Sequence, residues 1–397
     1  MIRRPPRSTQ GVSSAASDVY KRQDLGGLLE LAKSERVELT VVGPEQPLAA
    51  GLVDCFEEAG LKCFGPRAAE ARLESSKTFT KEFLQRHNIP TAAYGSFDDL
   101  DAAMTYVHSQ PLPVVIKADG LAAGKGVVVA ETLPEAEDTL RNMLEHNTFG
   151  KAGSKVVVEE FLRGEEASFI AMVDDTLIGP LARSQDHKTR DEGDRGPNTG
   201  GMGAYSPTLA IDESLSQKIQ EKIIDKTIAS LRNEGITFKG FLYAGIMLND
   251  GEPYVLEYNV RMGDPECQPI LMRMNSDLFQ YLNACVNDTL EKMPPISWKN
   301  KSAVCVVLAS NGYPESYPKD DEISGLDLVY DDAYVFHAGT KKQNKKIITN
   351  GGRVLGVTAL GNTLELAIKN AYDVSEKIFW ENKYSRTDIG KKGLTYL

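Results

Sequence analysis

The sequence predicts a multidomain protein of the α/β and α+β classes, with an N-terminal α/β domain, a larger central core and a small C-terminal α/β domain. Its 397 residues exceed what one hydrophobic core usually supports, so more than one packed unit is expected. Hydrophobic residues make up 41% and charged residues 25% of the chain, near the globular average. From Asp24 onward, helical and strand-like hydrophobic patterns alternate, as they do in α/β folds.

The N-terminal region contains three helical and two strand-like patterns. Helical spacing covers residues 25–34, 46–59 and 76–87, and buried strands are expected at 37–42 and 61–64. Pro90 places the end of the third helix near Asn88, because the residue before a proline disfavours helical geometry.

The central and C-terminal regions continue the alternation. Strands are expected at 113–117, 126–130, 155–160, 238–249 and 254–260, helices at 133–147, 211–233 and 264–286, and a hairpin at 167–182. Residues 291–300 are expected to form a linker, and strands near 304–309, 334–338 and 353–358 are expected in the C-terminal unit.

The first 23 residues differ from the rest of the chain. They hold five basic and one acidic residue and many serines, and they lack the apolar stretch of a secretory signal. We interpret them as translated sequence from outside the true gene. A transit-like tail and a disordered native extension are the alternatives.

Charge and cysteine content exclude several classes of protein. The net charge is −11, and the residues after position 23 carry 40 − 55 = −15, which disfavours non-specific nucleic-acid binding. The five cysteines form no CxxC pair, so neither a disulfide framework nor a zinc site is indicated. No apolar run approaches the roughly 18–20 residues of a membrane span, and we expect a cytoplasmic protein without membrane partners.

A glycine-rich loop joins the strands expected at 113–117 and 126–130. Gly120, Gly124 and Gly126 would let backbone N–H groups approach a phosphate, and Lys125 would add charge. A P-loop is rejected, because the glycine spacing is short by one residue and a strand follows where a helix is required. A hairpin turn without a ligand stays open, although Lys117 is costly to bury without an anion.

The strand expected at 155–160 ends in carboxylates. Glu159 and Glu160 are followed by Phe161 and Leu162, and Glu166 comes soon after. A strand end with free backbone groups can pair with the edge of a flat heterocycle. A solvated acidic rim is the alternative.

Strand alternation at 254–260 places three polar groups on one face. Glu257, Asn259 and Arg261 share that face because side chains two residues apart point the same way. Oxygen ligands of this kind suit Mg²⁺ or Mn²⁺, and Arg261 could hold a carboxylate or phosphate. An exposed strand face with a cross-strand ion pair is the alternative.

Residues 184–207 read as a long loop with donors, acceptors and five glycines, which suits a closing lid or a small-substrate site. Disorder is the alternative. Nothing in the sequence requires His187 to act as a general base.

Several segments together resemble the ATP-grasp ligases, and within them the phosphoribosylamine–glycine ligase family. The resemblance runs from Asp24 to the C-terminus. The matching segments are VVGPEQPL, IKADGLAAGKGV, EEFLRGEEASF, SQDHK, GPNTGGMGAYSP, GFLYAG, EYNVRMGDPE, FHAGT and NGGRVLGVTALG. The resemblance implies a non-family segment at 1–23, an N-terminal α/β domain at 24–90, an ATP-grasp domain at 91–295 and a C-terminal domain at 296–397.

The resemblance implies that ATP phosphorylates glycine and that 5-phosphoribosylamine attacks the glycyl phosphate, giving glycinamide ribonucleotide, ADP and phosphate. A monomer using Mg²⁺ or Mn²⁺ is expected. Asp186, Lys188 and Arg261 would face the reacting substrates, and Glu257 and Asn259 would bind the metal. The implied ATP-binding residues are Lys77, Lys117, Gly120, Gly124, Lys125, Gly126, Glu159, Glu160, Phe161, Leu162 and Glu166.

One departure from the family is expected to matter. The family begins with a strand and a GSGGREHA-like turn at a helix N-terminus, which residues 1–23 do not resemble. We therefore expect a gene model truncated at its 5′ end, with the first βα unit of the N-terminal domain missing. An ATP-binding fragment without turnover and another ATP-grasp carboxylate–amine ligase are the alternative functions.

Overall fold

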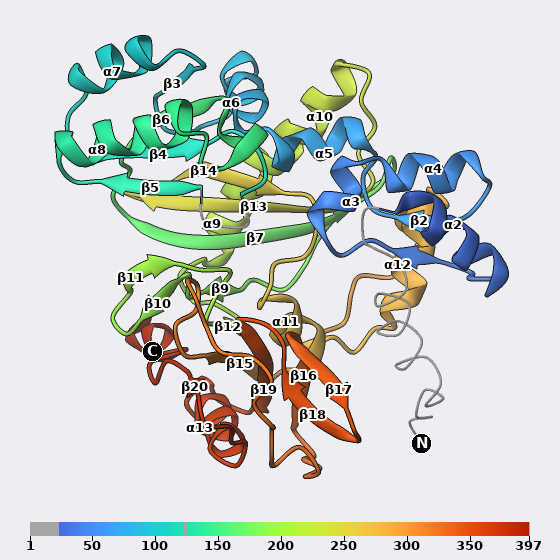
Figure 1. Ribbon diagram of the computed structural model, residues 1–397. Coiled ribbons are helices and arrows are strands. Elements are labelled where there is room, and N and C mark those ends of the chain that lie inside the picture. The colour runs from blue at the N-terminus through green and yellow to red at the C-terminus, as the bar shows by residue number, and fades with distance from the viewer. Residues whose placement is uncertain (1–23, 123–125, 397) are drawn as a thin grey trace.

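The computed structural model describes residues 24–122 and 126–396. Two four-stranded sheets lie one above the other, a third sheet lies below them, and a group of short N-terminal helices flanks the second sheet (Figure 1). The predicted mixed α/β multidomain class is confirmed. The predictions for residues 1–23, Gly124 and Lys125 fall outside the described residues.

The described part of the N-terminal unit contains four helices and two strands, and each strand is only two residues long. Its elements are α2 (Leu25–Ser34), β1 (Thr40–Val41), α3 (Glu45–Ala49), α4 (Leu52–Glu58), β2 (Cys63–Phe64) and α5 (Ala68–Ser75). β1 and β2 pair in parallel. The single helix predicted at 46–59 is wrong, because Gly51 adopts a φ of 84° and separates α3 from α4.

The first four-stranded sheet is antiparallel, in the order β3-β6-β4-β5. Its elements are β3 (Tyr94–Phe97), β4 (Val114–Ala118), β5 (Val127–Ala130), β6 (Val156–Glu160), with α6 (Lys77–Arg86), α7 (Leu100–His108) and α8 (Leu133–Leu140). Ser76, Asp99 and Thr132 cap the three helices by accepting hydrogen bonds from backbone N–H groups three residues on. The predicted strands around the glycine-rich loop are confirmed.

The second sheet is also antiparallel, in the order β14-β13-β7-β8. Its elements are β7 (Glu165–Val173), β8 (Ile178–Pro180), β13 (Gly240–Asn249) and β14 (Glu252–Asn259), covered by α9 (Glu213–Ile219), η3 (Gln220–Asp225) and α10 (Lys226–Asn233). The predicted 211–233 helix contains a π-helical turn at η3. One hydrophobic core, which includes Phe56, Phe83, Ile223 and Leu242, joins this sheet to the N-terminal helices.

The third sheet corrects the prediction of a long loop at 184–207. That segment forms β9 (Gln185–Asp186), β10 (Thr189–Asp191), β11 (Arg195–Asn198) and β12 (Gly203–Ser206). The sheet order is β16-β19-β15-β12-β9, so two strands from the central region lie in the C-terminal sheet. The pattern hid these strands because each is only two to four residues long.

The remaining C-terminal elements surround this sheet. They are α11 (Cys267–Arg273), α12 (Leu278–Val286), η4 (Leu290–Lys292), β15 (Ser302–Ser310), β16 (Ala333–His337), β17 (Thr340–Gln343), β18 (Lys346–Thr349), β19 (Arg353–Gly361), α13 (Leu364–Ser375), β20 (Lys383–Tyr384) and η5 (Lys391–Tyr396). α13 packs on β15 and β19 and buries Trp380, Val306 and Val357 beneath it in one apolar core.

The described residues contain no helix that is both long and apolar enough to cross a membrane. All five cysteines lie within the described ranges and are free thiols.

Candidate active site

The residues predicted to carry chemistry lie where the first sheet faces the second. Lys117, at the end of β4, donates a hydrogen bond across this junction to the backbone oxygen of Leu256 on β14, at 3.1 Å. Contacts of Glu159 with Lys117, of Lys77 with Gly120 and of Lys188 with Glu257 connect the surrounding elements to this junction.

Lys117 is paired with a carboxylate of the protein. Its Nζ lies 2.8 Å from Glu159 Oε1, and Lys81 Nζ lies 3.0 Å from Glu159 Oε2. All three side chains are less than one-tenth exposed. Burial lowers the pKa of Lys81 to about 8, against the attraction of Glu159. Two ammonium groups and one carboxylate leave a net positive charge, which favours an anionic ligand beside Lys117.

The side chain of Glu159 points in a different direction from those of Glu160 and Phe161, which were predicted to bind the nucleotide with it. Its side chain points into the interior as an ion-pair partner, while Glu160 accepts a hydrogen bond from Ala93 N–H at 2.9 Å. Phe161 is 38% exposed and so presents a ring surface at the end of β6. Lys81 was missed by sequence reasoning. The sequence feature that could have indicated Lys81 is its position four residues after Lys77, on a helix face that also buries Phe83 and Leu84.

Lys77 lies against the glycine-rich loop. Its Nζ donates to the backbone oxygen of Gly120 at 3.2 Å, and burial lowers its pKa. Asp119 anchors the start of α6 by accepting from Thr78 N–H at 2.6 Å. A Cβ on Gly120 would lie 2.9 Å from Ala152, so close packing of the backbone requires glycine there. The structure thus brings Lys77 to the loop, as predicted.

The polar face predicted on β14 is present as a connected chain of contacts. Arg261 Nη2 donates to Asn259 Oδ1 at 3.1 Å, and Asn259 Nδ2 donates to Glu257 Oε1 at 3.5 Å. Arg261 also pairs with Glu74 at 2.9 Å. Glu74, on α5, was missed by sequence reasoning because nothing in its local pattern distinguishes it from a surface carboxylate.

Glu257 is held as a carboxylate by its surroundings. Burial opposes its ionisation, but the positive charges of Lys188, Lys117, Lys77 and Arg261 outweigh that effect and lower its pKa to about 2. A carboxylate oxygen beside an amide oxygen is the hard donor set that Mg²⁺ and Mn²⁺ prefer. Glu257 and Asn259 therefore fit a divalent cation that takes its other ligands from water and phosphate oxygens.

Asp186 and Lys188 lie at the opposite wall, beside β7 and β13. Lys188 Nζ lies 3.4 Å from Glu257 Oε1 and 3.7 Å from Glu166 Oε2, and these carboxylates contribute to raising its pKa against burial. Together with Ser168 and Tyr243, Asp186 and Lys188 line a small cavity of about 10 Å³. That is near the volume that a single water molecule needs.

A second buried carboxyl group, Glu266, completes this wall. It accepts a hydrogen bond from Ser168 Oγ at 2.5 Å, and Ser168 Oγ lies 2.8 Å from Tyr243 Oη. Burial is the main cause that raises the pKa of Asp186, and the negative charge of Glu266 nearby raises it further. Burial also raises the pKa of Glu266. Among the described residues, Asp186 Oδ1 is buried without a hydrogen-bond partner. Glu266 is the last residue of the RMGDPE segment, and this segment is the sequence feature that could have indicated it.

Arg353 on β19 ties two segments of the site together. Its Nη1 donates to the backbone oxygens of Gly200 at 2.5 Å and Asp264 at 2.9 Å, and its Nη2 pairs with Asp264 Oδ2 at 2.8 Å. A C-terminal side chain thus fixes both the NTGG and RMGDPE loops. Sequence reasoning quoted the NGGRVLGV segment but gave Arg353 no role.

His187 does not have the environment of a general base. Its ring is 4% exposed, its Nε2 accepts from Gly390 N–H at 3.3 Å, and its Nδ1 lies 3.2 Å from Gly203 O. Burial and the positive charge of Arg386 lower its pKa to about 4. A neutral imidazole that donates through Nδ1 satisfies both contacts.

Comparison with known proteins identifies the family. Three family models match the chain: phosphoribosylglycinamide synthetase N domain over residues 6–74, ATP-grasp (A) domain over 75–267 and C domain over 303–392. The N-domain match begins within residues 1–23, the segment interpreted from sequence as lying outside the family.

Individual relatives agree with the family models. The chain is 52% identical to phosphoribosylamine–glycine ligase of Vibrio parahaemolyticus, over 94% of this chain and 87% of the relative. It is 52% identical to that of Allochromatium vinosum, over 98% of this chain and 90% of the relative.

Solved structures give the same result at the level of the fold. The crystal structure of phosphoribosylamine–glycine ligase from Thermotoga maritima superposes with a TM-score of 0.76 at 38% identity, covering 82% of this chain and 81% of that one. Biotin carboxylase from Campylobacter jejuni superposes with a TM-score of 0.72 at 13% identity, covering 94% and 81%, and so shares the fold. The chain belongs to the phosphoribosylglycinamide synthetase family of ATP-grasp proteins, whose relatives are the phosphoribosylamine–glycine ligases.

Proposed function

We propose that this chain ligates glycine to 5-phosphoribosylamine at the expense of ATP, forming glycinamide ribonucleotide, ADP and phosphate. The observation that carries the proposal is the set of contacts around Glu257: Lys188 Nζ lies 3.4 Å from its Oε1, and Asn259 links it to Arg261. The positive charges of Lys117 and Lys77 also help to lower its pKa. Such a cationic site around a hard oxygen ligand suits the transfer of a phosphoryl group, where catalysis comes mainly from positioning and from neutralising charge.

ATP would lie between the two four-stranded sheets. Lys77, Lys117 and the loop from Gly120 to Gly126 would hold its phosphates. The segment Glu160 to Leu162 would frame the adenine, with the exposed ring of Phe161 as one wall. Glu159 would contribute by holding Lys117 in place, and Glu166 would approach the ribose.

Glu257 and Asn259 would bind Mg²⁺ or Mn²⁺ together with phosphate oxygens. When bound, the cation would neutralise charge on the transferred phosphoryl group. Lys188, which contacts Glu257, would add a fixed positive charge on the same side.

The two substrates would meet at the wall formed by Asp186, Lys188 and Arg261. An oxygen of the glycine carboxylate attacks the γ-phosphorus of ATP and ADP departs. The amine nitrogen of phosphoribosylamine then attacks the acyl carbon and phosphate departs with the bonding electrons. The nitrogen loses a proton in this step, and the ionised form of Asp186, whose Oδ1 has no hydrogen-bond partner among the described residues, is suited to accept it.

We propose that the protein acts in the cytoplasm as a monomer. Five free cysteines suit a reducing compartment.

The test is ADP release by purified protein with ATP, Mg²⁺ and freshly made phosphoribosylamine, with and without glycine. Glycine-dependent ADP, with glycinamide ribonucleotide in equal amount, is the expected result. Bicarbonate or formate in place of glycine serves as the control for another ligase activity. Saturable ATP binding without glycine-dependent ADP would sink the proposal and leave a nucleotide-binding protein without turnover.

A further inference from the structure

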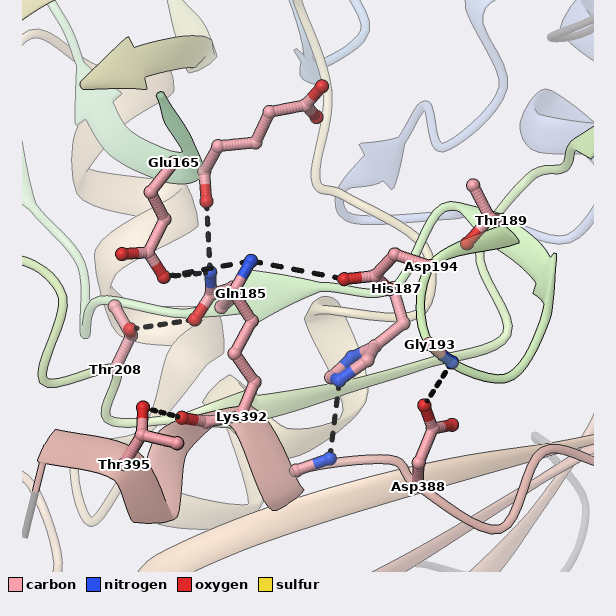
Figure 2. A network of polar contacts seen from close by, with 12 residues as sticks. Glu165, Gln185, His187, Thr189, Gly193, Asp194, Thr208, Asp388, Lys392 and Thr395 are labelled. Carbon is pink, nitrogen blue, oxygen red and sulfur yellow. Dashed lines mark hydrogen bonds and ion pairs between the residues drawn. The ribbon is translucent and has the colours of Figure 1, made fainter. Parts of the chain in front are cut away.

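The last residues of the chain cross over the segment that carries Asp186 and Lys188. We call residues 386–396 the C-terminal strap. It lies against the hairpin of β10 and β11, and Figure 2 shows Asp388 facing Gly193 and Lys392 reaching toward both Glu165 and Asp194. The strap and the hairpin are separated by nearly two hundred residues of sequence, so their contact is a product of the tertiary fold.

Arg386 is the centre of this contact. Its side chain is 1% exposed, and each of its five N–H donors has an acceptor. Nε and Nη2 donate to the two oxygens of Asp388, both at 2.7 Å, and Nη2 also donates to Asp194 Oδ1 at 3.0 Å. Nη1 donates to the backbone oxygen and the hydroxyl of Thr189, at 3.0 and 3.1 Å.

The partners of Arg386 extend the connection. Asp388 Oδ2 accepts from Gly193 N–H at 2.9 Å, and Thr387 Oγ1 donates to Glu192 Oε1 at 2.5 Å. Although partial burial opposes its ionisation, the hydrogen bonds from Arg386 and Gly193 lower the pKa of Asp388 to about 2. The strap is therefore bonded to the start of β10 and to the turn that joins β10 to β11.

These contacts surround the backbone of Lys188 on both sides. Arg386 holds the carbonyl of Thr189, the next residue, and Thr199 donates to the carbonyl of Lys188 through both its N–H and its hydroxyl, each at 2.8 Å. On the other side, Gly390 of the strap donates to the ring of His187. The strap thus holds the carbonyl of Thr189 and the ring of His187, while the backbone groups of His187 and Lys188 bond to residues 199–203.

The ammonium group of Lys188 depends on this backbone placement. Its contacts with Glu257 and Glu166 are 3.4 and 3.7 Å long, so its side chain is held by charge more than by tight hydrogen bonds. Asp186 has no hydrogen-bond partner for Oδ1 among the described residues, so its position also follows from the backbone of β9. A shift of the hairpin would move both groups relative to Glu257.

We propose that Arg386 is a positioning residue, which uses the C-terminal strap to hold Asp186 and Lys188 in the geometry that ligation requires. This inference rests on the proposed function for the role of those two residues. Arginine is required because a lysine at this position carries the charge but lacks the planar set of five donors.

The test compares Arg386→Gln and Arg386→Lys with the wild type and with Arg190→Gln. Arg190 lies on the same hairpin, and its guanidinium pairs with Asp191 and Glu315 and not with the strap. We expect kcat to fall about 10- to 100-fold in Arg386→Gln, because misplacement by about 1 Å costs on that order. The KM for ATP should stay within about twofold, since its proposed ligands lie on other elements. Arg386→Lys should recover part of the loss, and Arg190→Gln should match the wild type.

Amide hydrogen exchange provides a second readout that does not require turnover. Peptides covering residues 184–198 should exchange faster in Arg386→Gln than in the wild type, while peptides covering β4 and β6 should not change. If the wild type shows no glycine-dependent ADP release, the proposed function fails and the exchange result alone decides on the strap. Unchanged exchange at 184–198, or unchanged kcat in a folded Arg386→Gln protein, would overturn the inference.

A milder variant guards against loss of folding. Asp194 is 51% exposed, and Asp194→Ala removes one partner of Arg386 without opening a buried cavity. We expect a smaller decrease in kcat with the same unchanged KM for ATP. An equal loss of ATP binding would instead indicate a general defect in stability and would contradict a positioning role.

Discussion

The ammonium group of Lys117 and the carboxylate of Glu159 lie 2.8 Å apart on neighbouring strands, and both are buried. Sequence reasoning required an anion near Lys117 because a buried lysine is costly. The protein supplies that anion itself, and Lys81 on α6 supplies a second cation on the other carboxylate oxygen. The resulting excess of positive charge leads to the first prediction.

Lys117→Ala is expected to weaken ATP binding by about 30-fold or more, because truncating one partner of a buried charged contact costs about 2 kcal/mol or more. Isothermal titration with a non-hydrolysable ATP analogue measures this directly. Lys155→Ala is the control. The Lys155 side chain, just before β6, is about half exposed, and its Nζ lies 4.0 Å from Asp98 Oδ2. Wild-type affinity in Lys117→Ala would show that Lys117 serves only Glu159.

Glu257→Gln is expected to lower the apparent affinity for Mg²⁺ in the ligase assay by at least about tenfold. The amide has the same shape as the carboxylate but carries no charge for the cation. Binding of Mn²⁺ in the presence of the ATP analogue, followed by electron paramagnetic resonance, checks the effect without turnover.

Glu252→Gln is the matched control for the metal prediction. Glu252 lies on the same strand but pairs with Lys218 and Lys222 at the surface. Identical Mg²⁺ dependence in Glu257→Gln and the wild type would exclude Glu257 as a metal ligand.

The buried ring of His187 predicts a loss of stability in acid. Its pKa is lowered to about 4 by burial and by Arg386, which outweigh Asp194 and Asp388, whereas an unfolded histidine titrates near 6.5. Above pH 6.5 both states are neutral; between pH 6.5 and pH 4 the unfolded state binds more protons. The free energy of unfolding should therefore fall by about 3 kcal/mol as pH falls through this window.

Urea unfolding of the wild type and His187→Gln at pH 7 and pH 4 measures this contribution. The decrease in the wild type should exceed that in His187→Gln by about 3 kcal/mol. His146→Gln, at an exposed position, should behave as the wild type does. Parallel pH dependence in His187→Gln and the wild type would argue that His187 is protonated in the folded protein.

Gly203→Ala is expected to destabilise the fold by about 1–3 kcal/mol. A Cβ at this position would lie 2.6 Å from Ile389 and 2.7 Å from the backbone oxygen of Cys305, in the middle of the C-terminal sheet. Gly43→Ala is the control, because a Cβ there meets no atom within 4 Å. Thermal unfolding distinguishes them, and equal melting temperatures would show that the sheet can relax around the added methyl group.

The sequence was sufficient for features that depend on local pattern. Alternation predicted that Glu257, Asn259 and Arg261 share one face; the first two lie on β14, Arg261 follows its end, and the structure connects all three by hydrogen bonds. The apolar runs on either side of the glycine-rich loop likewise predicted β4 and β5, because a short run of β-branched residues beside a turn has a recognisable pattern.

Features that depend on distant partners could not be predicted. β12 is four residues long, and all four of its residues pair with β15, a hundred residues later. Glu159 was predicted to face a ligand, but nothing in its local pattern shows that Lys81 draws its side chain inward. Arg353 and Arg386 act on loops far away in sequence, so their roles appear only in three dimensions.

The pairing of β12 with β15 has a consequence for synthesis on the ribosome. Chains emerge from the N-terminus and domains generally fold in that order. The nucleotide-facing sheets can close before residues 302–310 exist, but β12 and the backbone around Lys188 cannot reach their final arrangement until β15 and the strap have emerged. The substrate wall is therefore the last part of the molecule to mature, and a nascent chain is expected to acquire its nucleotide-binding surface before it acquires the means to use it.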